Sequence, residues 1–265
     1  MTLSSAPSPT AQQGLRILAP IALGVVGLGL WQFLVSVVGV SDYLLPSPAA
    51  IVGELVAFAP AIAGAAAVTG ANALVGLVVG MVVAVTLAAL ASRWHAVDAM
   101  ASPVVAALAV VPIVALAPVL NSMFGADSQF GRQAIAALAA FVPVFVNALR
   151  GLRQARPIHR ELLHAYAATG AQAFRFVTLP SAVPHLMTGI RLASSLAVIS
   201  ALVAEYFGGP RGGLGSFIST SAATSAYARA WAYVVAGIVI GLAFFLVTAL
   251  LERLVLRRIP SGATS

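Results

Sequence analysis

The residues that could carry out chemistry are few in this sequence, and their types exclude several mechanisms. All 14 basic residues are arginines, seven residues are acidic and none is cysteine. A nucleotide-binding P-loop needs a lysine that reaches the β- and γ-phosphates, so this chain cannot hydrolyse ATP in that way. Thiolate metal sites, cysteine nucleophiles and disulfides are excluded as well. We therefore predict no catalytic residue and no cofactor bound by the chain itself.

The histidines are the remaining candidates for a metal site. His159 and His164 are five residues apart, which does not give the i, i+4 pairing of a zinc site on one helix face, and no acidic residue lies suitably between them. His95 and His185 are expected at the membrane interface. The sequence therefore predicts no metal ion.

The elements that carry these residues are membrane spans. The chain of 265 residues is 61% hydrophobic and 8% charged, with a mean hydropathy of +1.02, whereas soluble domains carry about 25% charged residues. We expect an all-α polytopic membrane protein with one membrane domain, 14–258, between tails at 1–13 and 259–265. At roughly 20 residues per crossing, the apolar runs predict six spans. They lie near 17–40, 66–91, 99–120, 133–149, 183–207 and 231–254.

Two features between these runs affect packing. Three prolines between 41 and 60 break the first span, which leaves a short interfacial helix near 51–58. The second span is rich in glycine, alanine and valine, which lets neighbouring helices approach closely.

Prolines and polar side chains within spans mark a candidate translocation pathway. Pro103, Pro112 and Pro118 in the third span free backbone carbonyls that need a neighbouring group or a water-filled cavity, unless that helix is only a kinked packing element. Polar side chains in spans also form interhelical hydrogen bonds, and the three serines of the fifth span cannot all share one helix face. The candidate pathway residues are Pro112, Pro118, Asn147, Ser194, Ser195 and Glu205.

Glu205 ends an apolar run, and a carboxylate at that position needs a partner. Arg211 is near in sequence, so a structural salt bridge is expected, with contact to an arriving binding protein or substrate as the alternative. The glycine-rich run 208–216 contains a proline and lacks GxGxxG spacing. It is therefore interpreted as a turn or a short re-entrant element rather than a phosphate cradle.

The arginines set the expected orientation. If the N-terminus is cytoplasmic, Arg132, Arg211 and Arg229 fall outside and ten arginines fall inside, as the positive-inside rule requires. Arg191, deeper in the fifth span, is expected to snorkel to the cytoplasmic surface. Both termini are therefore predicted to be cytoplasmic. The inside set is Arg16, Arg93, Arg150, Arg153, Arg156, Arg160, Arg175, Arg253, Arg257 and Arg258.

The segment 150–180 is the longest polar interval within the membrane domain, and the orientation places it in the cytoplasm. Residues 161–176 favour helix, so two short helices across a turn are expected, with Gly170 supplying the turn. Leu179-Pro180 and Pro184 are expected to end the second helix where the chain re-enters the membrane. We interpret the segment as a docking element for a cytoplasmic partner.

The segment resembles the cytoplasmic loop of permease subunits of binding-protein-dependent ABC importers, which follows E-A-A-x3-G-x9-I-x-L-P. Aligned on Leu179-Pro180, all spacings are kept. Leucines replace the two alanines and Ala167 replaces the glycine, which would cost about 1 kcal/mol if that position needs φ > 0. The residues that the resemblance assigns to ATPase coupling are Glu161, Leu162, Leu163, Ala167, Gly170, Val177, Leu179 and Pro180.

Other stretches extend the resemblance over most of the chain. Leu45-Pro46-Ser47-Pro48, Glu205-Tyr206-Phe207 and Gly213-Leu214-Gly215 are similar to permeases of the nitrate, sulfonate and taurine type. Within that type, three stretches are most similar to the branch associated with pyrimidine thiamin precursors and riboflavin. They are ELLHAYAATG, LASSLAVISALVAEYFGGPRGGLG and YARAWA.

The resemblance implies a multi-pass protein of the bacterial inner membrane with no chemistry of its own. Two copies, as a homodimer, would form the pathway, two ATPase subunits binding ATP and Mg would dock on the loops, and an extracytoplasmic substrate-binding protein would deliver the solute. Membrane lipid is the surrounding partner and nucleic acid is not one. The alternatives are a self-sufficient secondary transporter or channel and an intramembrane enzyme, but the spans show no persuasive repeat, ionisable relay or catalytic set.

Overall fold

The computed structural model describes residues 9–41, 43, 45–125, 128–154, 166–208 and 212–258. These residues form helices joined by short connections and contain no strand. The helices are, in chain order, α1 (Pro9–Ser36), α2 (Pro48–Ala57), α3 (Ala59–Arg93), α4 (His95–Val110), α5 (Ile113–Phe124), α6 (Phe130–Arg153), α8 (Gly170–Ala173), the π-helix η1 (Phe174–Thr178), α9 (Leu179–Phe207), α10 (Leu214–Ala223) and α11 (Tyr227–Leu256).

Within this described part of the chain, five helical stretches are long and apolar enough to cross a membrane, and the bent pair α4 and α5 makes a sixth if it is counted as one span. The predicted all-α polytopic fold with about six spans is therefore confirmed. The first helix begins at Pro9, within the segment 1–13 that was expected to be a tail.

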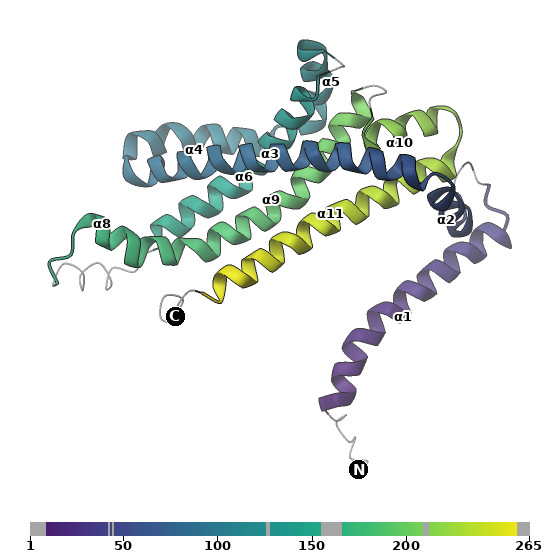
Figure 1. Cartoon of the computed structure of the whole chain (residues 1–265), viewed down its shortest axis with the longest axis horizontal. Helices are drawn as coiled ribbons and strands as arrows, with labels where there is room; N and C mark the ends of the chain where they lie inside the picture. The colour runs from purple at the N-terminus through teal and green to yellow at the C-terminus, as the bar shows by residue number, and fades with distance from the viewer. Residues whose placement is uncertain are drawn as a thin grey trace.

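The centre of the bundle is built from α3, α6 and α9, with α11 packed along α9 (Figure 1). Gly76 and Gly80 on α3 face alanines of α6 so closely that an added Cβ at Gly76 would meet the backbone nitrogen of Ala137 at 2.9 Å, and one at Gly80 would meet the Cβ of Ala140 at 3.1 Å. This is the small-residue contact that lets membrane helices pack backbone to backbone. The close approach predicted from the glycine and alanine content of this span is confirmed.

One end of the bundle is closed by α2, α10 and the start of α11. Ser47 caps α2 and Pro48 begins it, so the short helix predicted near 51–58 is confirmed with a start three residues earlier. The carboxylate of Glu54 on α2 accepts a 2.8 Å ion-pair contact from Arg229 on α11, and the guanidinium of Arg229 lies 3.7 Å from the centre of the Phe58 ring. These contacts join α2 to α11 at the end of the bundle where α10 also packs.

The third predicted span is not one kinked helix. Its two halves, His95–Val110 and Ala115–Phe124, meet at an angle of 104°. Val111 and Pro112 between them have extended backbone dihedrals. A proline disfavours the helical conformation of the residue before it, which explains why the chain turns here instead of bending gently.

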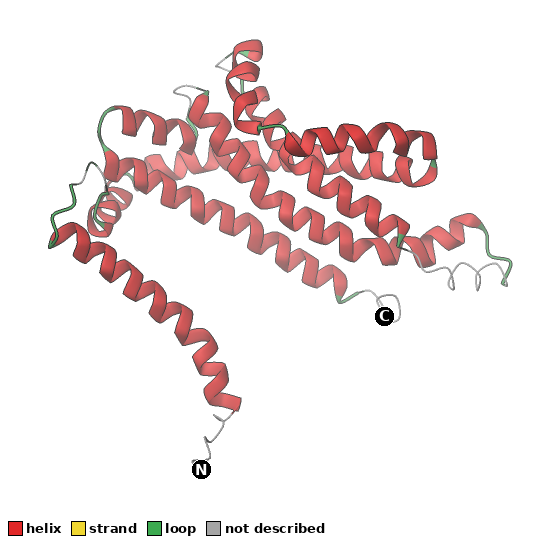
Figure 2. Cartoon of the chain, turned by 180° about the vertical axis from the view of Figure 1, so that it is seen from behind, coloured by secondary structure: helices red, strands yellow, loops and turns green. Residues whose placement is uncertain are grey.

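The first span lies largely outside the bundle. Figures 1 and 2 show α1 leaving the other helices beyond α2. Its apolar side chains are exposed on all sides, Leu23 at 74% for example, although Val35 is buried and Trp31 makes an edge contact with Trp231 at 5.7 Å between ring centres. The exposed surface of α1 is therefore suited to contact with lipid or with another protein.

Candidate coupling site

The turn in the polar segment is made by Ala167, not by Gly170. Ala167 has φ of 49°, whereas Gly170 is the first residue of α8 and has no positive φ. The cause lies in Thr169, whose hydroxyl accepts a hydrogen bond from the Gln172 amide while the Gln172 side chain accepts one from the Thr169 amide. This capping box starts the helix directly after Thr169. The left-handed turn therefore falls before the cap, at the position where the importer pattern has glycine.

Replacing Ala167 with glycine is expected to stabilise the protein by about 0.5 to 1 kcal/mol, because glycine adopts positive φ without the steric cost that a Cβ imposes. Denaturant unfolding of the detergent-solubilised protein measures the change. Gly170→Ala is the matched comparison, since its Cβ would meet nothing within 4 Å and its φ is negative. A destabilised Ala167→Gly variant would contradict the assignment of the turn.

The chain re-enters the bundle without ending a helix. α8, η1 and α9 form one helical stretch of 38 residues from Gly170 to Phe207, so the expected helix end at Leu179-Pro180 was wrong. Pro180 stands in the first turn of α9, and the preceding amide, Leu179 N–H, bonds to the Phe174 carbonyl in the π-helical pattern. A π turn is one of the ways in which a helix accommodates a local break in its ladder, and here it lies directly before the proline.

Of the eight coupling residues named from the resemblance, five are among the described residues. Glu161, Leu162 and Leu163 lie outside the described residues. Val177 and Gly170 line a recess of about 690 Å³ between the segment 168–178 and the end of α3, where Ser92 and Arg93 form the opposite wall. The start of this helical stretch is therefore separated from α3 by open space rather than packed against it.

A buried polar cluster joins α9 to α10 and α3. Glu205 is fully buried, and its carboxylate accepts hydrogen bonds from Thr69 Oγ1 at 2.7 Å, Asn72 Nδ2 at 3.1 Å and the Gly215 amide at 3.2 Å. The Leu214 amide donates to the Thr69 hydroxyl at 2.9 Å. Glu205 and Thr69 thus satisfy amides at the start of α10, where a negative charge is also favoured by the helix dipole. The expected partner Arg211 lies outside the described residues.

The cluster continues into α6 through Gln129. Its side-chain oxygen accepts from Asn72 Nδ2 and from Arg132 Nη1, each at 2.9 Å. Arg132 is fully buried, which the sequence did not predict. Because α6 begins at Phe130, Arg132 lies in the first turn of that helix, at the end opposite Arg150 and Arg153. The charge of Arg132 also attracts the Glu205 carboxylate.

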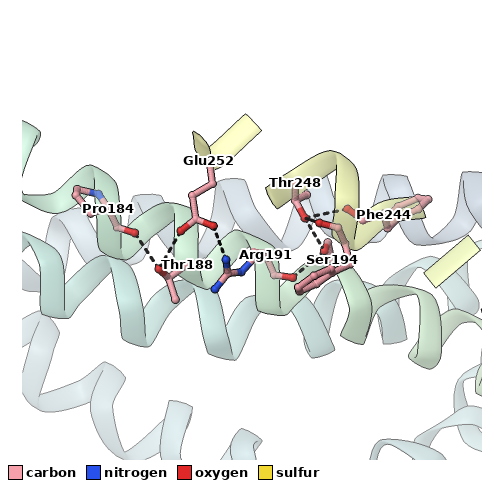
Figure 3. A network of polar contacts seen from close by, with 8 residues as sticks. Pro184, Thr188, Arg191, Ser194, Phe244, Thr248 and Glu252 are labelled. Carbon is pink, nitrogen blue, oxygen red and sulfur yellow. Dashed lines mark hydrogen bonds and ion pairs between the residues drawn. The ribbon is translucent and has the colours of Figure 1, made fainter. Parts of the chain in front are cut away.

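A second polar network joins α9 to α11 (Figure 3). Arg191 Nη1 lies 2.8 Å from Glu252 Oε2, and the Thr188 hydroxyl contacts the other carboxylate oxygen at 3.4 Å. Ser194 and Thr248 share a 3.0 Å hydrogen bond one turn further along. Arg191 therefore forms an ion pair with a neighbouring span, where the sequence predicted snorkelling to the surface. Ser194 joins the two helices, as polar side chains in membrane helices commonly do.

The other candidate pathway residues lie in separate contacts. Pro112 forms the break before α5, and the Pro118 carbonyl accepts from Ser122 at 2.8 Å within that helix. Asn147 donates to the Pro143 carbonyl of its own helix at 2.8 Å. Ser195 lines an apolar groove of about 460 Å³ between α9, α10 and α11. The structure therefore does not gather the six candidates into one site within a single chain.

The buried cluster around Glu205 includes residues that were not among the sequence candidates. Thr69 and Gln129 are separated from Glu205 by 136 and 76 positions, and no local pattern pairs residues so far apart. The capping box at Thr169 and Gln172 was accessible from the sequence, because threonine followed three residues later by glutamine is a helix-start signal. Among the described residues, no group of three histidine or acidic side chains could hold a metal ion.

Residues 76–260 match the family described as binding-protein-dependent transport system inner membrane component. This chain belongs to that family. The match extends from the middle of α3 past the end of α11, so it includes the network between α9 and α11, the capped turn, the π-helix and the Glu205 cluster except for Thr69 and Asn72. The permease is thus a multi-pass inner membrane protein of a transport system, in agreement with the resemblance found in the segment 150–180.

Curated relatives of the permease have named transport roles. It is 31% identical over 203 residues to the formylaminopyrimidine transport permease protein ThiX of Halalkalibacterium halodurans, covering 76% of this chain and 80% of the relative. It is 32% identical over 168 residues to the riboflavin transport system permease protein RibX of Chloroflexus aurantiacus, covering 62% and 60%. The putative aliphatic sulfonates transport permease protein SsuC of Escherichia coli is 30% identical over 209 residues, covering 75% of each chain.

Proposed function

We propose that this permease forms the translocation pathway of an ATP-driven importer and that residues 150–180 couple it to a separate ATPase. The observation that supports coupling most directly is the uninterrupted helix from Gly170 to Phe207. A force applied at α8 is carried along α9, because a helix transmits displacement along its axis. α9 contacts α3, α6, α10 and α11. A partner that moves α8 would therefore move the centre of the bundle.

The partners follow from one coupling segment per chain. Two copies related by a two-fold axis, the commonest symmetry of homo-oligomers, would present two segments to two ATPase subunits, which bind ATP and Mg. An extracytoplasmic binding protein would deliver the solute to the opposite face. The arginine distribution supports cytoplasmic termini and a cytoplasmic coupling segment.

The relatives support a small organic solute as cargo. Two are named for a formylaminopyrimidine and for riboflavin, so a pyrimidine or flavin-like vitamin precursor is the first candidate. An aliphatic sulfonate or a nitrate-type anion is the second, because other relatives are named for sulfonates and taurine. Titrating the associated binding protein with a formylaminopyrimidine, riboflavin and an alkanesulfonate separates the two classes.

Gly170→Phe is expected to lower ATP-driven uptake at least about tenfold, the equivalent of 1.4 kcal/mol, while the protein still inserts in the membrane. Gly170 is exposed and lines an open recess, and a Cβ there meets nothing within 4 Å. A loss would therefore report contact with the ATPase rather than misfolding. Glu161→Ala should have the same effect if its carboxylate contacts the partner.

Gly64→Phe is the matched control, because a Cβ at Gly64, on α3, also has open space. Uptake into membrane vesicles, ATP hydrolysis and co-purification of the ATPase are measured together. Full uptake by both Gly170→Phe and Glu161→Ala would rule out the coupling role. Uptake that needs an ion gradient but no ATP would favour the self-sufficient secondary transporter.

A further inference from the structure

A groove lies between α4 and α6 next to the end of α6, away from both polar clusters. Its volume is about 380 Å³, and nearly all of its surface is apolar. From Ser102 to Ala109 along α4 it extends roughly 10 Å at 1.5 Å per residue. The apolar walls are formed by Val105, Ala106 and Ala109 of α4 and by Val142, Phe145, Val146 and Leu149 of α6.

The groove opens into a cationic recess. Arg150 and Arg153 line one end of the groove, and both also line a second, shallower recess of about 530 Å³ together with Gln154 and His185. The apolar groove therefore leads into a recess lined by hydrogen-bond donors, at the level where α6 ends.

The charge available in this recess belongs to Arg150. Arg153 is already occupied, because its Nη2 lies 2.8 Å from the Asp98 carboxylate and donates to the Ala91 carbonyl at 3.2 Å. Ser102 also donates to Asp98 at 3.0 Å. Arg150 is exposed and makes no hydrogen bond or ion pair with any described residue. An anion entering the recess would thus meet one uncompensated guanidinium with Gln154 and His185 beside it.

We propose that the groove and the recess together bind one anionic phospholipid, with an acyl chain between α4 and α6 and the headgroup phosphate on Arg150. Basic pockets between membrane helices commonly bind anionic headgroups, and guanidinium is well matched to phosphate. The site lies in the leaflet on the side of the coupling segment.

Among the described residues, charge complementarity favours a lipid phosphate over a second copy of this chain as the occupant. Four acidic residues are described, and each is engaged: Glu54 with Arg229, Asp98 with Arg153, Glu252 with Arg191, and Glu205 within its buried cluster. None of these four is available to face Arg150 across an interface. A lipid phosphate supplies the missing negative charge, and its acyl chain supplies the apolar occupant of the groove.

Thermal unfolding of the full-length permease in mild detergent tests the proposal. Phosphatidylglycerol is expected to raise the unfolding midpoint by at least about 3 °C, by binding the folded state only. Phosphatidylcholine with the same acyl chains and inorganic phosphate should not. Arg150→Gln should abolish the shift by removing the charge, and Ala106→Phe should abolish it by filling the groove. Arg253→Gln should retain it, since this exposed arginine in the last turn of α11 lines neither cavity.

Two checks keep the result interpretable. Arg150→Gln without lipid should unfold at the wild-type midpoint, and Ala109→Leu serves as a second groove-filling variant if Ala106→Phe does not fold. An undiminished phosphatidylglycerol shift in Arg150→Gln would overturn the proposal. An equal rise of the unfolding midpoint with phosphatidylcholine or with phosphate alone would also overturn it. A change from dimer to monomer in Ala106→Phe would overturn it as well, because the groove would then be an interface between copies.

Discussion

Replacing Glu205 with alanine is expected to lower the free energy of unfolding by about 3 kcal/mol or more. The buried carboxylate accepts hydrogen bonds from Thr69, Asn72 and the Gly215 amide, and each donor left without an acceptor in a dry interior costs about 1 to 3 kcal/mol. The start of α10 would also lose a negative charge at its positive dipole end. Denaturant unfolding of the detergent-solubilised permease measures the loss.

The free energy of unfolding of Glu205→Gln should lie between those of the wild type and the alanine variant. The amide keeps one hydrogen-bond acceptor but brings a donor towards groups that themselves donate. Glu54→Ala is the control, since Glu54 and Arg229 have side chains that are 29% and 36% exposed and such pairs contribute about 0 to 1 kcal/mol. Equal effects of Glu54→Ala and Glu205→Ala would show that the cluster does not hold α10 in place.

Gly80→Ala is expected to destabilise the permease by about 2 kcal/mol or more, although the change adds one methyl group. The new Cβ would collide with the Ala137 carbonyl of α6 and lie 3.1 Å from the Ala140 Cβ. The obstacle is backbone, so relief requires α3 and α6 to separate, and overpacking of this kind typically costs 1 to 3 kcal/mol. The yield of folded protein and its denaturant unfolding provide the measurement.

Gly70→Ala on the same helix is the matched control, because a Cβ at Gly70 has nothing within 4 Å. Alanine there should be neutral or slightly stabilising, since alanine has the higher helix propensity. If Gly80→Ala is as stable as Gly70→Ala, the contact between α3 and α6 is looser than the structure shows.

Local features of the sequence predicted much of this fold. Apolar runs of about 20 residues locate membrane helices because the bilayer demands them, and the prolines between 41 and 60 indicated the short helix α2, although its start at Pro48 lies three residues before the predicted one. The spacing from Glu161 to Pro180 identified the family before any fold was known. The cap formed by Thr169 and Gln172 was also present in the sequence, and weighing it would have placed the turn at Ala167.

The contacts of the charged residues were predicted less well. Arg191 was expected to snorkel to the cytoplasmic surface but is paired with Glu252, and the burial of Arg132 was not predicted. Local polarity does not tell which way a helix face is turned, and that rotation decides whether a charge meets water, lipid or a partner.

The sequence by itself determined that this chain is an all-α membrane permease of the binding-protein-dependent type, because span length and motif spacing are properties of neighbouring residues. Only the tertiary structure decided which hydrogen-bond and ion-pair partners Glu205, Arg132 and Arg191 have. It also decided that the third span breaks at Pro112. The physical reason is that these outcomes depend on contacts between helices. Thr69 and Glu205, 136 positions apart, come together only when α3, α9 and α10 pack.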